Sequence, residues 1–312
     1  MKHFNHLTDF SLEELQATLK QTKDLKLNRT NTPKCLDKQS WGLLFYKSST
    51  RTRVSFEVGV QELGANAIVL NSQNTQIGRG ESIKDTAIVL SRYLHGLVIR
   101  AYDHSVVTEF AKHANMPIVN GLTDFNHPCQ VLTDIFSTLE RIDPENIDLA
   151  ALKDKKIAFF GDTASNMANS WIIAAAYIGF DLVLAGPEGY EPTQEVLEKL
   201  KAENLTPRHT FTNNPIQAAE NVDIINTDVW VSMGDEAEAK ERKKALADFQ
   251  VNEALVAKAN KDFLFLHCLP AHIGEEVTQA VIEGPNSIVY DQAENRLHTQ
   301  KAILAQLQEH SN

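Results

Sequence analysis

The chain has 312 residues, of which 43% are hydrophobic and 23% are charged. This composition is typical of soluble globular proteins, and the length predicts two domains of roughly 150 residues each. The 30 basic and 41 acidic residues give a formal net charge of −11. That charge argues against general nucleic-acid binding, which requires a basic surface.

The cysteines and the apolar runs indicate the compartment. Cys35, Cys129 and Cys268 are widely spaced and contain no CxxC pair, which favours a reducing environment over a disulfide framework. The first residues lack the apolar run of a signal peptide, and no run of about 18 apolar residues predicts a membrane helix. We therefore expect a cytoplasmic protein without membrane contact.

The first predicted element is a helix. Ser11 and Glu14 form a capping-box pattern, and Leu12, Leu15 and Leu19 follow at helical spacing. Further along the chain, predicted strands comprise residues 42–46, 67–71, 96–99, 117–120, 156–160, 181–185, 223–227, 263–266 and 287–290. Predicted helices comprise residues 82–93, 106–114, 128–141, 166–178, 194–202, 237–249 and 297–310.

The predicted strands are continuous apolar runs, as in parallel sheets buried on both faces. Their alternation with helices predicts an α/β fold of two doubly wound parallel-sheet domains joined by interdomain helices. The polar stretch 141–155 is the best boundary candidate. We predict domains at residues 1–141 and 142–296, with the helix 297–310 packing back on the first.

Polar clusters follow the predicted strands, where ligands bind in open α/β sheets. They comprise residues 48–53, Arg100, 127–130, 161–170, Asp228, 267–270 and 291–296. A cleft between two domains is the simplest geometry that brings these clusters together.

The segment Ser-Thr-Arg-Thr-Arg (residues 49–53) is the most informative of these clusters. It follows a strand and opens a helix, where free N–H groups and the helix dipole favour an anion. Arg51 and Arg53 add forked donors suited to phosphate or carboxylate oxygens. The alternative is a capped surface helix with exposed arginines.

Two nucleotide-binding patterns are missing from the sequence. It contains no Gly-x-x-x-x-Gly-Lys-Ser/Thr loop, so a nucleotide-hydrolysing P-loop is not indicated. Gly161-Asp-Thr-Ala-Ser-Asn166 lacks the second and third glycines of a dinucleotide fingerprint, which argues against a nicotinamide cofactor.

His-Cys-Leu-Pro (residues 267–270) allows three interpretations. Cys268 could be a thiolate nucleophile, a metal ligand or a small packing residue. Without a second paired motif, a zinc site is not indicated. A neighbouring Asp228 would favour a polar role for the thiol.

Three segments together resemble the signatures of the aspartate/ornithine carbamoyltransferase family. They are Ser-Thr-Arg-Thr-Arg (49–53), His-Pro-Cys-Gln (127–130) and His-Cys-Leu-Pro (267–270), in the family's order and spacing. The resemblance extends from about residue 3 to residue 308. Asp-Val-Trp-Val-Ser-Met-Gly (228–234) and Cys268 are similar to the ornithine branch, whereas the aspartate branch typically has His-Pro-Leu-Pro and no Ser-Met-Gly.

The resemblance implies that carbamoyl phosphate and L-ornithine react to give L-citrulline and phosphate, without a cofactor, a metal or a covalent intermediate. The first domain would bind carbamoyl phosphate and the second ornithine. The implied carbamoyl-phosphate residues are Ser49, Thr50, Arg51, Thr52, Gln76, Arg100, His127, Gln130, Cys268, Leu269 and Arg296. The implied ornithine residues are Asn166, Asp228, Ser232 and Met233. Arg100, His127, Asp228 and Cys268 would be the catalytic residues, with Cys268 facing the attacking amine.

The family also implies an assembly and a backbone feature. Gln76 matches a position that reaches into a neighbouring subunit, and the family implies a homotrimer. The Leu269–Pro270 bond is a candidate for a cis peptide. Two residues depart from the family pattern: Ser48, where relatives usually have Asp or Pro, and Ile273, where many bacterial relatives have Arg.

Several alternatives stay open at this point. The acceptor could be putrescine or an N-acylated ornithine, although putrescine would leave Asn166 and Asp228 without a partner group. A non-catalytic paralogue could keep the fold, but the intact site residues argue against it. Arginine biosynthesis is the default direction, and arginine degradation is the alternative.

Overall fold

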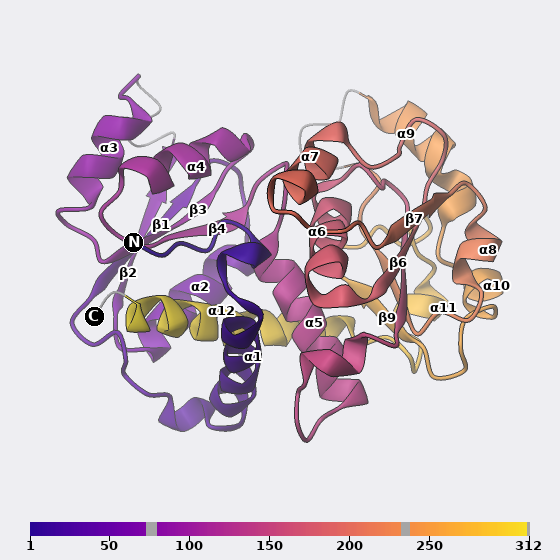
Figure 1. The fold of residues 1–312 in the computed structure, drawn as a ribbon, viewed down its shortest axis with the longest axis horizontal. Helices are drawn as coiled ribbons and strands as arrows, with labels where there is room; N and C mark the ends of the chain where they lie inside the picture. Colours follow the sequence, from indigo (N-terminus) through magenta and orange to yellow (C-terminus); the bar gives the residue numbers. More distant parts are fainter. Residues whose placement is uncertain (73–79, 232–237, 311–312) are drawn as a thin grey trace. The chain divides into compact units, whose positions relative to one another are not determined.

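Two parallel β-sheets organise the computed structural model, which describes residues 1–72, 80–231 and 238–310. The chain divides into two compact units (Figure 1): unit 1 comprises Met1–Phe136 and Glu294–Asn312, and unit 2 comprises Ser137–Ala293. The two division points fall within α5 (Pro128–Ile142) and α12 (Val289–Glu309). The predicted boundaries, after residues 141 and 296, fall later in the same two helices. The predicted fold class is confirmed.

Unit 1 contains a four-stranded parallel sheet in the order β2-β1-β3-β4. Its strands are β1 (Ser40–Phe45), β2 (Asn66–Asn71), β3 (Gly96–Arg100) and β4 (Ile118–Leu122), and its helices before α5 are α1 (Leu12–Leu27), α2 (Arg51–Glu62), α3 (Ile83–Leu90) and α4 (His104–His113). In Figure 1, α3 and α4 cover one face of this sheet, whereas α1, α2 and α12 lie on the other. The strand order reverses between β1 and β3, which is where open α/β sheets bind ligands.

Local sequence signals explain the start and the packing of these elements. The predicted capping box is confirmed, because Ser11 Oγ accepts from the Glu14 N–H and Glu14 Oε2 accepts from the Ser11 N–H. Trp41 packs against Gly96 on the neighbouring strand, and a Cβ at position 96 would lie 2.4 Å from the indole ring. Only glycine leaves room for the fully buried tryptophan there.

Unit 2 contains a five-stranded parallel sheet in the order β7-β6-β5-β8-β9. Its strands are β5 (Lys156–Phe160), β6 (Asp181–Ala185), β7 (His209–Thr212), β8 (Ile224–Thr227) and β9 (Leu264–His267). Its helices are α6 (Asn166–Ala174), α7 (Gln194–Ala202), α8 (Pro215–Ala219), α9 (Ala239–Leu246), α10 (Glu253–Val256) and α11 (Gln279–Ile282). Figure 1 shows α6 and α7 on one side of the sheet and α8, α10 and α11 on the other. The strand order reverses between β5 and β8.

One predicted strand is wrong. Residues 287–290 are not a strand, because α12 begins at Val289 and only Ser287 makes an isolated bridge, to Phe265. Ile288 and Val289 are buried at the start of the helix. A short apolar run does not distinguish a strand from a buried helix start, so residues 291–296 lie on a helix rather than after a strand.

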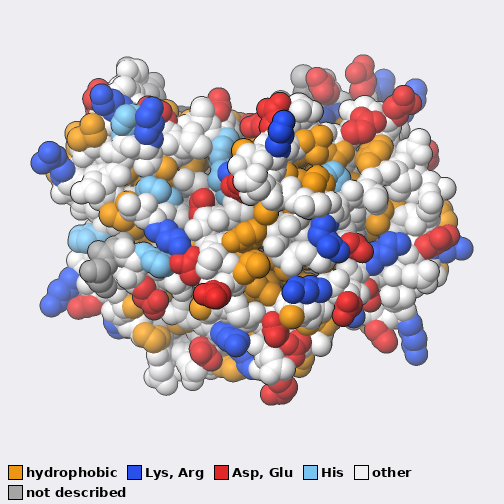
Figure 2. Space-filling model, viewed as in Figure 1, with side chains coloured by type: hydrophobic (Ala, Val, Ile, Leu, Met, Phe, Trp, Pro, Cys, Tyr) orange, Lys and Arg blue, Asp and Glu red, His pale blue; other side chains and the backbone are white. Residues whose placement is uncertain are grey.

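The surface carries mixed charges. In Figure 2, Lys and Arg side chains are interspersed with Asp and Glu side chains on the face shown. An anion-binding site on this protein therefore requires a local cluster of basic and hydrogen-bond-donating groups. Within the part of the chain that the structure describes, no helix combines the length and the apolar character needed to span a bilayer.

Candidate active site

Two arginines of unit 1 converge on one hydroxyl group. Thr52, on the first turn of α2, accepts at Oγ1 from Arg100 Nη1 at 3.0 Å and from Arg296 Nη2 at 2.6 Å. Arg100 ends β3 and Arg296 lies on α12, so three distant segments meet at the carboxyl edge of this sheet. Thr52 and Arg296 are almost completely buried.

The turn that enters α2 supplies further polar groups. Ser49 Oγ accepts from the Thr52 N–H at 3.2 Å, and Thr50 occupies the position before the helix. Arg51 lies exposed at the start of α2. Arg53 is also exposed, but it forms an ion pair with Glu57 at 3.6 Å. The two arginines that the sequence grouped together therefore have different surroundings.

His127 lies among cations next to this cluster. Burial lowers the pKa of its imidazole well below the usual value, and the charges of Arg296, Arg100 and Lys47 lower it further. The ring is therefore neutral at physiological pH, and it can donate one hydrogen bond without carrying charge. Sequence reasoning predicted His127 and missed Lys47.

Lys47 is a nearly buried cation on the loop after β1. Its Nζ pairs with Asp124 Oδ1 at 2.6 Å and lies 4.3 Å from the centre of the Tyr102 ring. A lysine beside a hydroxyl-rich turn is common on protein surfaces, and the sequence contained no signal that this one is buried.

Gln130 connects Arg296 to a buried carboxylate. Its Oε1 accepts from Arg296 Nη1 at 2.7 Å, and its Nε2 donates to Asp134 Oδ1 at 2.7 Å. Gln130 and Asp134 lie one turn apart on α5 and are both buried. The sequence predicted Gln130 but not Asp134.

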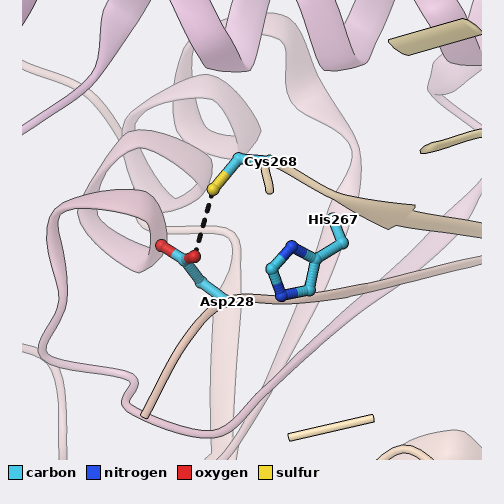
Figure 3. A group of neighbouring side chains, drawn as sticks. All are labelled: Asp228, His267 and Cys268. Atoms are coloured by element: carbon cyan, nitrogen blue, oxygen red, sulfur yellow. Dashed lines mark hydrogen bonds between the residues drawn. The ribbon is translucent and has the colours of Figure 1, made fainter. Parts of the chain in front are cut away.

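Unit 2 places an acid and a thiol side by side. Thr227 and His267 are paired in the parallel register of β8 and β9, so the next residues of both strands, Asp228 and Cys268, are neighbours. The Cys268 thiol donates to Asp228 Oδ1 at 3.0 Å, and Figure 3 shows the two groups facing each other beside the His267 ring. This contact supports the polar interpretation of the half-buried thiol.

Backbone and side-chain bonds fix the segment around Cys268. The Leu269 N–H donates to His267 Nδ1 at 2.9 Å, so the proton of the neutral ring is on Nε2 and faces Glu276 Oε1 at 3.2 Å. His267 and Glu276 are fully buried side chains. The predicted cis bond between Leu269 and Pro270 is confirmed. Sequence reasoning missed Glu276.

Asp228, His267 and Cys268 each offer a ligand atom, and these atoms lie within 4.8 Å of one another. A metal ion at this position would compete with the hydrogen bond of the thiol and with that of whichever His267 ring nitrogen it bound, because each of the two nitrogens already has a partner. The donors are thus already engaged with protein groups.

The remaining predicted residues fall into three groups. Asn166 is half-buried at the start of α6, after β5, where Ser165 caps the helix. Ile273 is 50% exposed and Ser48 is exposed. Gln76, Ser232 and Met233 lie outside the described residues. The predicted cleft between the domains stays a prediction.

The structure has a cluster of arginines and hydroxyl groups at the carboxyl edge of one parallel sheet. It has an acid–thiol pair at the carboxyl edge of a second sheet. Together these features define a two-domain α/β enzyme with an anionic substrate. Family models support this class. Residues 2–140 match the carbamoyl-P binding domain of aspartate/ornithine carbamoyltransferase, and residues 153–307 match the Asp/Orn binding domain. The chain belongs to the aspartate/ornithine carbamoyltransferase family.

Relatives at high identity cover almost the whole chain. An ornithine carbamoyltransferase of Geobacter sulfurreducens is 48% identical over 309 residues, which are 98% of this chain and 99% of the relative. The solved ornithine carbamoyltransferase of Pyrococcus furiosus is 45% identical, with a TM-score of 0.88 over 97% of this chain and 96% of that one. An anabolic ornithine carbamoyltransferase of Campylobacter jejuni is 35% identical, with a TM-score of 0.88 over 99% and 100% of the two chains.

Proposed function

We propose that the chain transfers the carbamoyl group of carbamoyl phosphate to the side-chain amine of L-ornithine, giving L-citrulline and phosphate in arginine biosynthesis. The convergence of Arg100 and Arg296 on Thr52 carries the proposal, because a doubly charged acyl phosphate needs such a local cluster in a chain with a net charge of −11. The relatives from Pyrococcus furiosus and Campylobacter jejuni that are described as anabolic support the biosynthetic direction.

In this proposal unit 1 binds carbamoyl phosphate. The phosphate oxygens accept hydrogen bonds from Ser49, Thr50, Arg51 and Thr52 at the start of α2, where the helix dipole also favours negative charge. The carbamoyl group contacts Arg100, His127, Gln130 and Arg296, together with Cys268 and Leu269 of unit 2. Negative charge develops on the carbamoyl oxygen during attack, and donors fixed in advance stabilise it.

Unit 2 binds ornithine. Asp228 accepts from the α-amino group, and Asn166, Ser232 and Met233 contact the rest of the amino acid. The reacting amine has a pKa of about 10.4 by analogy with lysine, so only about one molecule in a thousand is neutral at pH ~7.5, a cost of roughly 4 kcal/mol. Cys268 lies beside the reacting nitrogen, where the low-dielectric site favours the neutral amine. The new C–N bond forms as the bond from the carbamoyl carbon to phosphate oxygen breaks.

The assembly is proposed to be a cytoplasmic homotrimer in which Gln76 reaches a neighbouring site. Ile88 and Val89 on α3 and Tyr93 just after it are exposed large apolar side chains close together in the sequence, which is compatible with a protein–protein interface. The absence of a disulfide among Cys35, Cys129 and Cys268 is compatible with a reducing compartment.

Parallel assays of the purified chain test the function. Carbamoyl phosphate is offered with ornithine, N-acetylornithine, putrescine or aspartate, and the carbamoylated product is identified by mass spectrometry. We expect citrulline from ornithine and much slower turnover of the other three amines. Faster turnover of putrescine or the acylated amine would assign a different carbamoyltransferase, and no turnover of any amine would favour the non-catalytic alternative.

A further inference from the structure

Asp134 lies next to Gln130, one of the residues of the candidate site. It is fully buried on α5, and its Oδ1 accepts from Gln130 Nε2 at 2.7 Å. Because the Asp134 oxygen accepts this bond, the NH2 end of the Gln130 amide points toward Asp134 and the amide oxygen points away.

Arg296 imposes the same orientation from the opposite end of the amide. Its Nη1 donates to Gln130 Oε1 at 2.7 Å, and a guanidinium cannot accept in return. Rotating the amide by half a turn would place NH2 against the guanidinium and oxygen against the carboxylate. Both hydrogen bonds would then be lost in a buried position, where unsatisfied polar groups are costly.

The orientation of this amide has a chemical consequence. An amide oxygen has two lone pairs, and Arg296 uses one of them. The other can accept from an N–H group of a substrate. A carbamoyl group presents such an NH2, whereas an acetyl group of nearly the same size presents a methyl group.

We propose that Asp134 is a positioning residue that keeps the Gln130 oxygen turned toward the acyl group, so that the site selects carbamoyl phosphate over acetyl phosphate. This inference rests on the proposed function, because it assigns Gln130 to the carbamoyl group. A site built to accept from a substrate N–H rejects the isostere that lacks it, because the buried acceptor is then left without a donor.

The test compares the affinities of the full-length chain for carbamoyl phosphate and acetyl phosphate, both measured by calorimetry. In Asp134→Asn the new amide can donate as well as accept, so only Arg296 still fixes the orientation of Gln130. We expect the dissociation constant for carbamoyl phosphate to rise by up to about tenfold, the limit set by complete loss of one hydrogen bond, and that for acetyl phosphate to change less than about twofold. The preference between the two ligands falls accordingly.

Two controls separate positioning from packing. Thr133→Val removes a buried hydroxyl group on the same helix, one that donates to the Cys129 carbonyl. The ligand preference of this variant is expected to stay at the wild-type value. In a Gln130→Ala background, Asp134→Asn is expected to change the preference less than about twofold, because a residue that acts through Gln130 has no further effect once Gln130 is gone.

The outcomes distinguish the inference from the proposed function. Equal weakening of both ligands in Asp134→Asn, or a wild-type preference retained in it, would overturn the role of Asp134 alone. An undiminished effect in the Gln130→Ala background would also overturn it. A wild-type protein that binds neither acyl phosphate would instead remove the proposed function, and the inference with it.

Discussion

The Nη2 atom of Arg296 lies 2.6 Å from Oγ1 of Thr52, although 244 positions separate the two residues. Arg100 donates to the same oxygen, so both lone pairs of the hydroxyl are engaged by guanidinium groups. A hydroxyl group in this state can use only its hydrogen toward a further partner. Thr52 is thus held as a hydrogen-bond donor, and a phosphate oxygen, which accepts hydrogen bonds, needs such a donor as its partner.

Replacing Thr52 with valine keeps the shape and removes this donor. We expect Thr52→Val to weaken binding of carbamoyl phosphate by about 10- to 100-fold, the range for hydrogen bonds that involve charged groups. Titration calorimetry measures the change. Thr86→Val is the matched control, because the Thr86 hydroxyl donates to the Ser82 carbonyl within α3. Equal affinities in both variants would show that Thr52 does not contact the ligand.

Arg51 and Arg53 offer a matched comparison two residues apart. Arg51 lies exposed at the start of α2, whereas Arg53 pairs with Glu57 at 3.6 Å. We expect Arg51→Ala to reduce kcat/KM more than about 100-fold, because a charge-assisted contact to phosphate is lost. Arg53→Ala should change it less than about threefold, since exposed ion pairs contribute little. Similar losses in both variants would contradict the assignment of the phosphate site to Arg51.

The sequence predicted most of the fold because buried parallel strands are continuous apolar runs. The bounds of β5, β6 and α7 agree with the predicted ranges to the residue. The edge strand β7 was missed, because His-Thr-Phe-Thr (209–212) is polar and not fully buried, so it carries no apolar run. The apolar residues near 288 were assigned to a strand because nothing local shows that they start a long helix.

The site residues divide along similar lines. Residues in short polar segments after strands could be found, because topology places such segments at one edge of the sheet. Asp134, Lys47 and Glu276 could not, since each matters only through a neighbour that is distant in sequence or one helical turn away. The low pKa of His127 likewise depends on burial and on cations from three separate segments.

The Cys268 thiol and the Asp228 carboxylate are coupled by a hydrogen bond of 3.0 Å. We expect Cys268→Ser to raise the KM for ornithine about tenfold and to alter the pH profile, since a serine hydroxyl is shorter and does not ionise in this range. The KM for carbamoyl phosphate should change less. Cys35→Ser, at an exposed cysteine, serves as the control. Wild-type ornithine kinetics in Cys268→Ser would show that the thiol is only a packing residue.

Lys301 and Glu62 form an ion pair of 2.7 Å in unit 1, with the lysine fully buried and the glutamate partly exposed. Burial lowers the pKa of Lys301, although Glu62 opposes the shift. We expect Glu62→Gln to cost about 3 kcal/mol, because it leaves a buried ammonium group without its partner charge, and Lys301→Met to cost much less. Urea unfolding followed by circular dichroism measures both. The reverse order of stability would show that the ammonium group is well solvated.

His298 makes the folded state sensitive to acid. Burial, followed by the charge of Lys301, lowers its pKa to about 4, whereas the unfolded chain has a histidine pKa of about 6.5. Between these values the unfolded state binds more protons, so the unfolding free energy falls as the pH decreases from 6.5 toward 4. We expect His298→Leu to make this dependence shallower, by at most about 1.4 kcal/mol per pH unit. The measurement is a series of urea titrations across this range, with His310→Gln, at an exposed histidine just after α12, as the control. His298→Leu keeps every other histidine, so its difference in slope from wild type isolates His298. Equal slopes in wild type and His298→Leu would show that the buried imidazole does not titrate on unfolding.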